Sequence, residues 1–179
     1  KSFPQMMELR PIVVDEMKLV EYGTTALGMM GRVPDSIEVV RPLRNGVIAE
    51  YELTEIFMRE MIRKVTGPTL CFRPRLIIST PYGVTSVERR AVQEAGLGAG
   101  ARDVNLVPQP LAAASGIDLP INTPTGNMII SLGAGTTQAA VVSMSGIVSA
   151  ETSRTAGLRI DDAIINYARR KYGLIIGQT

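Results

Sequence analysis

The middle of the chain alternates strand-like and helix-like segments, and this order limits the fold more than any other feature. Arg75–Thr80 is an apolar run of strand length, and 104–107 is a second one. The Thr-x-x-Glu spacing at 85–88 is a capping box, which predicts a helix running towards Gly96. A proline followed by alanines at 110–115 favours a second helix. Strand, helix, strand and helix in this order predict an α/β protein.

The flanking segments are patterned more weakly. Residues 11–14 and 18–22 are short extended runs that we interpret as strands. Apolar side chains at helical spacing predict a helix over 53–65. Residues 127–150 form two or three β-rich runs joined by glycine turns, which predicts a meander. The segment 161–168 predicts a closing helix with two acids in its first turn, where the helix dipole favours them.

The composition narrows the class of protein. The chain has 179 residues, 45% of them hydrophobic, so it can bury a core. Its 19 basic and 17 acidic residues are scattered and form no basic stripe, so no nucleic acid is expected as a partner. The single cysteine, Cys71, excludes an internal disulfide and fits a reducing compartment. Because the chain has no histidine, it lacks Ser-His and Cys-His catalytic arrangements and the commonest metal ligand.

A glycine- and threonine-rich turn lies between two of the β-rich runs. It reads Gly133-Ala134-Gly135-Thr136-Thr137. Glycine tolerates positive φ and lets a ligand approach the backbone, so such a turn can expose successive N–H groups to phosphate oxygens. A plain hairpin turn explains these five residues equally well.

The segment "SLGAGTTQ", residues 131–138, resembles the second phosphate loop DIGGGTTE of the MreB-type bacterial actin homologues. The similarity extends over nearly all of residues 26–179, and ordered blocks at 28–55, 73–107, 110–128 and 156–164 carry it. The resemblance implies an actin-like (ribonuclease H-like) fold with mixed sheets flanked by helices. It also implies a division into residues 1–108, the remainder of a first lobe with a small peripheral subdomain, and residues 109–179, part of a second lobe carrying the phosphate loop.

Family resemblance further implies that ATP, with Mg²⁺, sits between the two lobes. Subunits of that family stack into filaments on the inner membrane surface and guide cell-wall synthesis. Carried over position by position, the expected catalytic residue is Gln109, and no side chain is expected to bind a metal ion directly. The expected nucleotide-binding residues are Ser131, Gly133, Ala134, Gly135, Thr136, Thr137 and Gly157.

Four positions in three motifs depart from the family pattern. Ser131 replaces the acid that holds water around Mg²⁺, and a neutral hydroxyl holds such waters less firmly. Gln109 replaces the second acid of the family's EEP motif; it can position a water but cannot take its proton. After Gly157, Leu158 and Arg159 replace the usual acidic pair. Arg159 either pairs with a phosphate or sits in solvent, and we favour solvent because charged loop side chains usually do.

Relative to the family, the chain is expected to be incomplete, a truncated or divergent member. No acid-Leu-Gly-Thr hairpin for the first phosphate loop is found before the turn, and the adenine-binding glycines have no match. We therefore expect ATP hydrolysis to be weak or lost, and leave open whether the chain is an enzyme.

The segment Leu70-Cys71-Phe72, flanked by basic residues, is the expected membrane contact. The matching loop of the family dips two apolar residues into the bilayer surface, and nearby basic residues add attraction to anionic lipid. The alternative is that Phe72 folds into the core and Cys71 is an ordinary small buried residue. The membrane alternative implies a cytoplasmic protein held peripherally at the inner membrane.

The favoured hypothesis is an MreB-like cytoskeletal protein, a filament subunit or modulator of cell shape and cell-wall morphogenesis. It would associate with itself or with a complete MreB and bind ATP through a degenerate phosphate loop. One alternative is an active actin-like ATPase whose other segments are absent from this chain. The other is a DnaK-like nucleotide switch, because the strand at 75–80 and the segment 110–114 are also similar to chaperones of that type.

Overall fold

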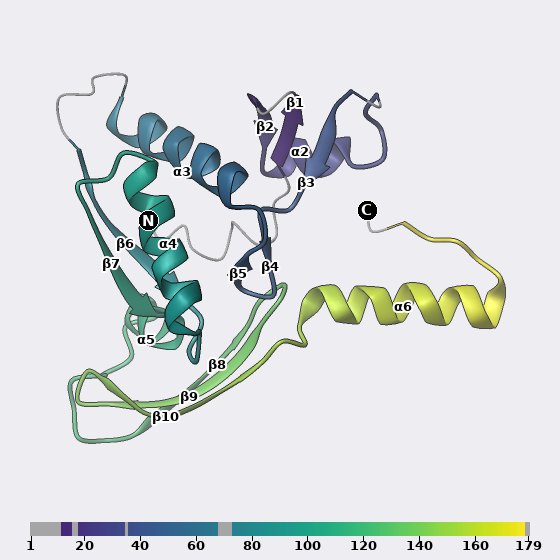
Figure 1. Cartoon of the computed structure of the whole chain (residues 1–179). Helices are drawn as coiled ribbons and strands as arrows, with labels where there is room; N and C mark the ends of the chain where they lie inside the picture. The colour runs from purple at the N-terminus through teal and green to yellow at the C-terminus, as the bar shows by residue number, and fades with distance from the viewer. Residues whose placement is uncertain (1–11, 16–17, 35, 68–72, 178–179) are drawn as a thin grey trace.

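The computed structural model describes residues 12–15, 18–34, 36–67 and 73–177. This part of the chain contains four small sheets and the helices α2 to α6 (Figure 1). In chain order the elements are β1 (Ile12–Asp15), β2 (Lys18–Tyr22), α2 (Thr24–Met29), β3 (Glu38–Val40), β4 (Leu43–Arg44), β5 (Val47–Ile48), α3 (Tyr51–Thr66), β6 (Arg75–Thr80), α4 (Ser86–Gly98), β7 (Asp103–Pro108), α5 (Gln109–Gly116), β8 (Asn127–Leu132), β9 (Thr137–Ser143), β10 (Gly146–Ser153) and α6 (Gly157–Tyr172).

The predicted strand–helix–strand unit is confirmed. β6 and β7 pair in parallel, and α4 connects them. The capping box forms as expected: the Thr85 N–H donates to Glu88 Oε2 at 2.8 Å, and the Glu88 N–H donates to Thr85 Oγ1 at 3.2 Å. α4 continues past Gly96 to Gly98. Gly96 packs closely on β7, where a Cβ would lie 2.8 Å from Val104 Cγ2.

One apolar core lies between the N-terminal sheet and α3. The sheet has the strand order β2-β1-β3, and Ile12 and Val14 of β1 pack with Phe57 of α3. The Tyr22 ring meets the Phe57 ring edge to face, with 5.7 Å between the ring centroids. This core confirms the strands predicted at the N-terminal end and the amphipathic helix predicted over 53–65.

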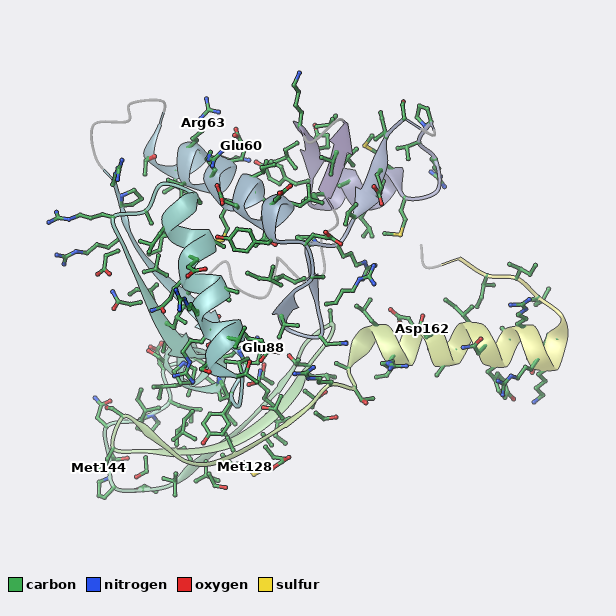
Figure 2. All side chains as sticks on the ribbon, in the orientation of Figure 1. Glu60, Arg63, Glu88, Met128, Met144 and Asp162 are labelled. Atoms are coloured by element: carbon green, nitrogen blue, oxygen red, sulfur yellow. The ribbon has the colours of Figure 1, made fainter. Side chains whose placement is uncertain are left out.

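The second core belongs to the antiparallel meander predicted for the C-terminal third, which has the order β10-β9-β8. One face of this sheet packs against α5. The other face is open: Met128, Ile130 and Leu132 of β8 are each about two-thirds exposed. Figure 2 shows Met128 on the outer side of this curved sheet, away from the helices. The buried members of the core are Ala114, Ile129, Ala140 and Val142.

α6 extends sideways from the end of this sheet and none of its residues is buried (Figure 1). It begins at Gly157, so the prediction that Asp161 and Asp162 lie in the first helical turn is wrong; they lie in the second. Ala156 caps the helix with extended backbone and without a side-chain hydrogen bond, so the sequence carries no local start signal there. The same boundary places Arg159 in a helix rather than in a loop.

The expected membrane segment Leu70-Cys71-Phe72 lies outside the described residues. Among the described residues, no helix combines the length and the apolar character needed to cross a bilayer.

Candidate nucleotide-binding loop

Residues 133–136 connect β8 to β9 and form the turn singled out in the sequence. The Gly133 N–H donates to the Thr136 carbonyl oxygen at 2.9 Å and closes the turn. Glycine tolerates positive φ, but neither Gly133 nor Gly135 is among the left-handed residues of the described chain. The turn is therefore shaped by its contacts rather than by left-handed backbone.

Those contacts come from the start of α6. The Gly157 N–H donates to the Gly133 carbonyl oxygen at 3.1 Å, and the Leu158 N–H donates to the Ala134 carbonyl oxygen at 2.9 Å. A Cβ at position 157 would lie 3.4 Å from that first oxygen. Two N–H groups that a helix start normally leaves unsatisfied are thus bound to the loop, and the loop replaces a capping side chain.

The same two bonds fix the direction of the loop amides. In a planar trans peptide the C=O and the N–H point in opposite directions. Since the carbonyls of Gly133 and Ala134 point at α6, the N–H groups of Ala134 and Gly135 point away from it. Within the described residues, no hydrogen bond uses the Gly135 amide. Two consecutive donors facing the same way suit an anion such as a phosphate group.

The polar side chains of the loop are largely occupied by the protein. Ser131 and Thr136 are buried, with exposures of 7% and 3%. The Thr137 Oγ1 donates to the Thr155 carbonyl oxygen at 2.7 Å and ties β9 to the segment that leads into α6. The structure thus brings Ser131, Gly133–Thr137 and Gly157 together at one end of the sheet.

Gln109, the first residue of α5, also reaches this region. Its Oε1 accepts a hydrogen bond from the Nε2 of Gln138, the buried residue that follows the loop on β9. The Gln138 Oε1 in turn accepts from the Tyr82 N–H at 2.7 Å. This contact could not be predicted from the sequence, because the partners lie on different elements and nothing in the spacing of positions 109 and 138 indicates that they meet.

A hairpin on the other side of the loop was also missed. β4 and β5 pair through Asn45 and Gly46, which have φ values of 52° and 78°. A Cβ at Gly46 would lie 2.6 Å from Pro81 Cγ and 3.0 Å from Thr136 Cγ2, so this hairpin packs directly on the loop. The Asn-Gly pair is a hairpin signal that the sequence did contain.

A cavity of about 310 Å³ adjoins the loop between the β4–β5 hairpin, the segment after β6 and the edge of β10. At its rim Arg154 makes an ion pair with Glu88, with 3.4 Å between the nitrogen and the oxygen. The pKa of Glu88 is lowered, chiefly because its carboxylate accepts from the Thr85 N–H, with Arg154 adding to the effect. Residues that line the cavity include Asn45, Pro81, Tyr82, Thr136, Thr152 and Arg154.

Two further expectations concern charge. Arg159 is exposed, as favoured, and lines a shallow apolar groove on α6 together with Ile160 and Ile164. Among the described side chains, no three or more His, Cys, Asp or Glu residues gather where they could hold a metal ion. The described side chains therefore do not form a protein-ligated Mg²⁺ site.

Comparison with protein families decides the ancestry. The model of the family described as MreB/Mbl protein matches residues 9–179. The chain belongs to the MreB/Mbl family. The cell shape-determining protein MreB of Haemophilus influenzae is 42% identical over 177 residues, covering 98% of this chain and 50% of that protein. The cell shape-determining protein Mbl of Bacillus subtilis is 40% identical over 161 residues, covering 90% of this chain and 48% of that protein.

Solved structures agree with this membership. MreB5 of Spiroplasma citri, in crystals bound to ADP or to AMPPNP, superposes with a TM-score of 0.85 at 30% identity. The match covers 94% of this chain and 51% of MreB5. This confirms the actin-like fold and does not favour the DnaK-like alternative. The chain spans about half the length of the MreB and Mbl relatives it matches.

Proposed function

We propose that this MreB/Mbl chain acts as a cytoskeletal filament subunit or modulator in bacterial cell shape, and that it binds ATP or ADP at residues 131–137. The observation that supports this most directly is the pair of consecutive amides, Ala134 and Gly135, directed away from α6 by the bonds from Gly157 and Leu158. MreB5, which shares the fold, is crystallised with ADP and with AMPPNP.

The chemistry proposed for this site is binding rather than efficient hydrolysis. Backbone amides supply hydrogen bonds to phosphate oxygens at no cost in charge burial. The side chains expected to act on a metal-bound water or on the attacking water are a neutral hydroxyl, Ser131, and a neutral amide, Gln109. Neither side chain accepts a proton at neutral pH, so neither can act as a general base.

The proposed division of the chain follows the arrangement of its cores. Residues 1–108 carry the core around Phe57 and the parallel β6–β7 pair, and residues 109–179 carry the meander and α6. We place nucleotide at the contact between these parts, where Tyr82 of the first meets Gln138 of the second.

Self-association and a peripheral membrane contact complete the proposal. The open face of β8 and the apolar stripe of α6, which includes Ile160, Ile164 and Tyr167, offer surfaces for a further copy or a complete MreB.

The membrane contact is proposed for Leu70-Cys71-Phe72, at the cytoplasmic side of the inner membrane. Retention on anionic liposomes that is lost in Phe72→Glu supports that contact, and retention unchanged by this substitution contradicts it.

Isothermal titration calorimetry with ATP and ADP, with and without Mg²⁺, tests nucleotide binding. Gly135→Asp places a carboxylate among the donors and is expected to abolish binding through charge repulsion. Gly116→Asp is the matched control, because a Cβ at Gly116 meets no atom within 4 Å and the residue lies at the end of α5. Equal affinity of the two variants would contradict the proposed site.

A further inference from the structure

A polar chain of three residues crosses from the segment after β6 to the start of α5. Gln138 is its centre and is almost completely buried, at 1% exposure. Its Oε1 accepts from the Tyr82 N–H at 2.7 Å, and its Nε2 donates to the Gln109 Oε1.

The direction of this chain is set by the main chain. A backbone N–H can only donate, so the oxygen end of the Gln138 amide must face Tyr82. The nitrogen end then faces Gln109, and the Gln109 amide must offer its oxygen in return, because the opposite orientation would place two donors against each other. The Tyr82 end is itself anchored, since Thr152 Oγ1 donates to the Tyr82 carbonyl oxygen at 2.8 Å.

This arrangement decides which atom of the Gln109 amide can bind a ligand. Its oxygen is engaged by Gln138, so the polar atom it retains for a ligand is Nε2, which carries two N–H donors. Donors match the oxygens of a terminal phosphate and add to the amides of Ala134 and Gly135. A group that presents N–H to its surroundings does not draw a proton from water.

We propose that Gln138 is a positioning residue that holds Gln109 as a hydrogen-bond donor to the terminal phosphate of a bound nucleotide. This inference rests on the proposed nucleotide site and assigns a role to a residue outside it. Gln138 thereby favours retention of nucleotide over its hydrolysis.

Gln138→Glu is expected to reverse the hydrogen bond between positions 138 and 109. An ionised carboxylate accepts from Tyr82 but has no proton for Gln109, so Gln109 must turn over, donate to the carboxylate and present its oxygen to the phosphate. When the introduced carboxyl group is protonated, its carbonyl oxygen still accepts from Tyr82 and its O–H donates to Gln109, which restores the original direction. The affinity ratio of wild type to Gln138→Glu for ADP is therefore expected to be about tenfold at pH 8 and to approach one as the pH is lowered.

A double-variant cycle separates positioning from simple repulsion between the new charge and the phosphate. In a Gln109→Leu background the pH-dependent part of the Gln138→Glu effect is expected to disappear, because no amide remains to be turned. If the pH dependence persists in full in that background, charge repulsion explains it and the positioning role is overturned.

The remaining outcomes are also distinct. Wild-type protein that binds neither ADP nor ATP overturns the proposed function and this inference together. Wild-type binding with equal affinity in Gln138→Glu at every pH overturns the positioning role alone. If Gln138→Glu does not fold, Gln109→Leu, at a half-buried position, is the second variant. It is expected to bind ADP about tenfold more weakly, without pH dependence. Unchanged affinity overturns the inference.

Discussion

Gly46→Ala tests whether the β4–β5 hairpin holds the loop through direct packing. Gly46 has a φ of 78°, and its missing Cβ would lie 2.6 Å from Pro81 Cγ and 3.0 Å from Thr136 Cγ2. The left-handed backbone costs an L-residue about 1–2 kcal/mol. The steric overlap adds about 1–3 kcal/mol if the surroundings yield as packed cores usually do. The total expected loss in the free energy of unfolding is roughly 2–5 kcal/mol, a large part of the stability of a domain of this size.

Gly83→Ala is the matched control for this experiment. Gly83 has a φ of 83°, but a Cβ there would meet no atom within 4 Å. It should therefore lose only the backbone part, about 1–2 kcal/mol. Urea denaturation followed by far-ultraviolet circular dichroism measures both variants, and the difference between them isolates the contact with Pro81 and Thr136. Agreement of the two values within about 0.5 kcal/mol would refute the packing argument.

Three further predictions concern other parts of the chain. Thr85→Ala removes the capping box of α4 and is expected to cost about 1 kcal/mol in urea denaturation. Because the folded-state pKa of Glu88 is lowered, its contribution to stability is present above the unfolded pKa of roughly 4.3 and is lost as the pH falls through the folded value. In a pH series of melts, the stability difference between wild type and Glu88→Gln should therefore shrink as the pH falls, because the carboxylate that accepts from the Thr85 N–H becomes protonated; a difference that stays constant with pH contradicts this. Gly96→Ala is expected to lower the free energy of unfolding by about 1–3 kcal/mol through overlap with Val104, although alanine has the better helix propensity. An increase in melting temperature would contradict the tight α4–β7 packing. Ile164→Glu on α6 should reduce self-association in analytical ultracentrifugation while changing the free energy of unfolding by no more than about 0.5 kcal/mol. Val65→Glu, at an even more exposed apolar position on α3, should leave association unchanged.

The order of elements could be predicted from the sequence because local signals carry it. The capping box at Thr85 and the strand at 75–80 both form as predicted. The start of α6 could not be predicted, because the groups that satisfy its first amides are the carbonyls of Gly133 and Ala134, more than 20 residues away. When distant carbonyl groups accept the hydrogen bonds of the first helical N–H groups, the residues at the helix start need no capping side chain, and their sequence gives no signal.

The same distinction applies to the site. The sequence by itself determined which family the chain belongs to, which turn carries the glycines and that Ser131 and Gln109 are neutral. Tertiary structure alone decided which way the loop amides point, that Gln138 contacts Gln109, and that Gly46 packs on Thr136. The physical reason is that residue types are local properties, whereas the direction of a peptide plane or a side-chain amide is set by the group it bonds to, and in a folded chain that group can come from any element.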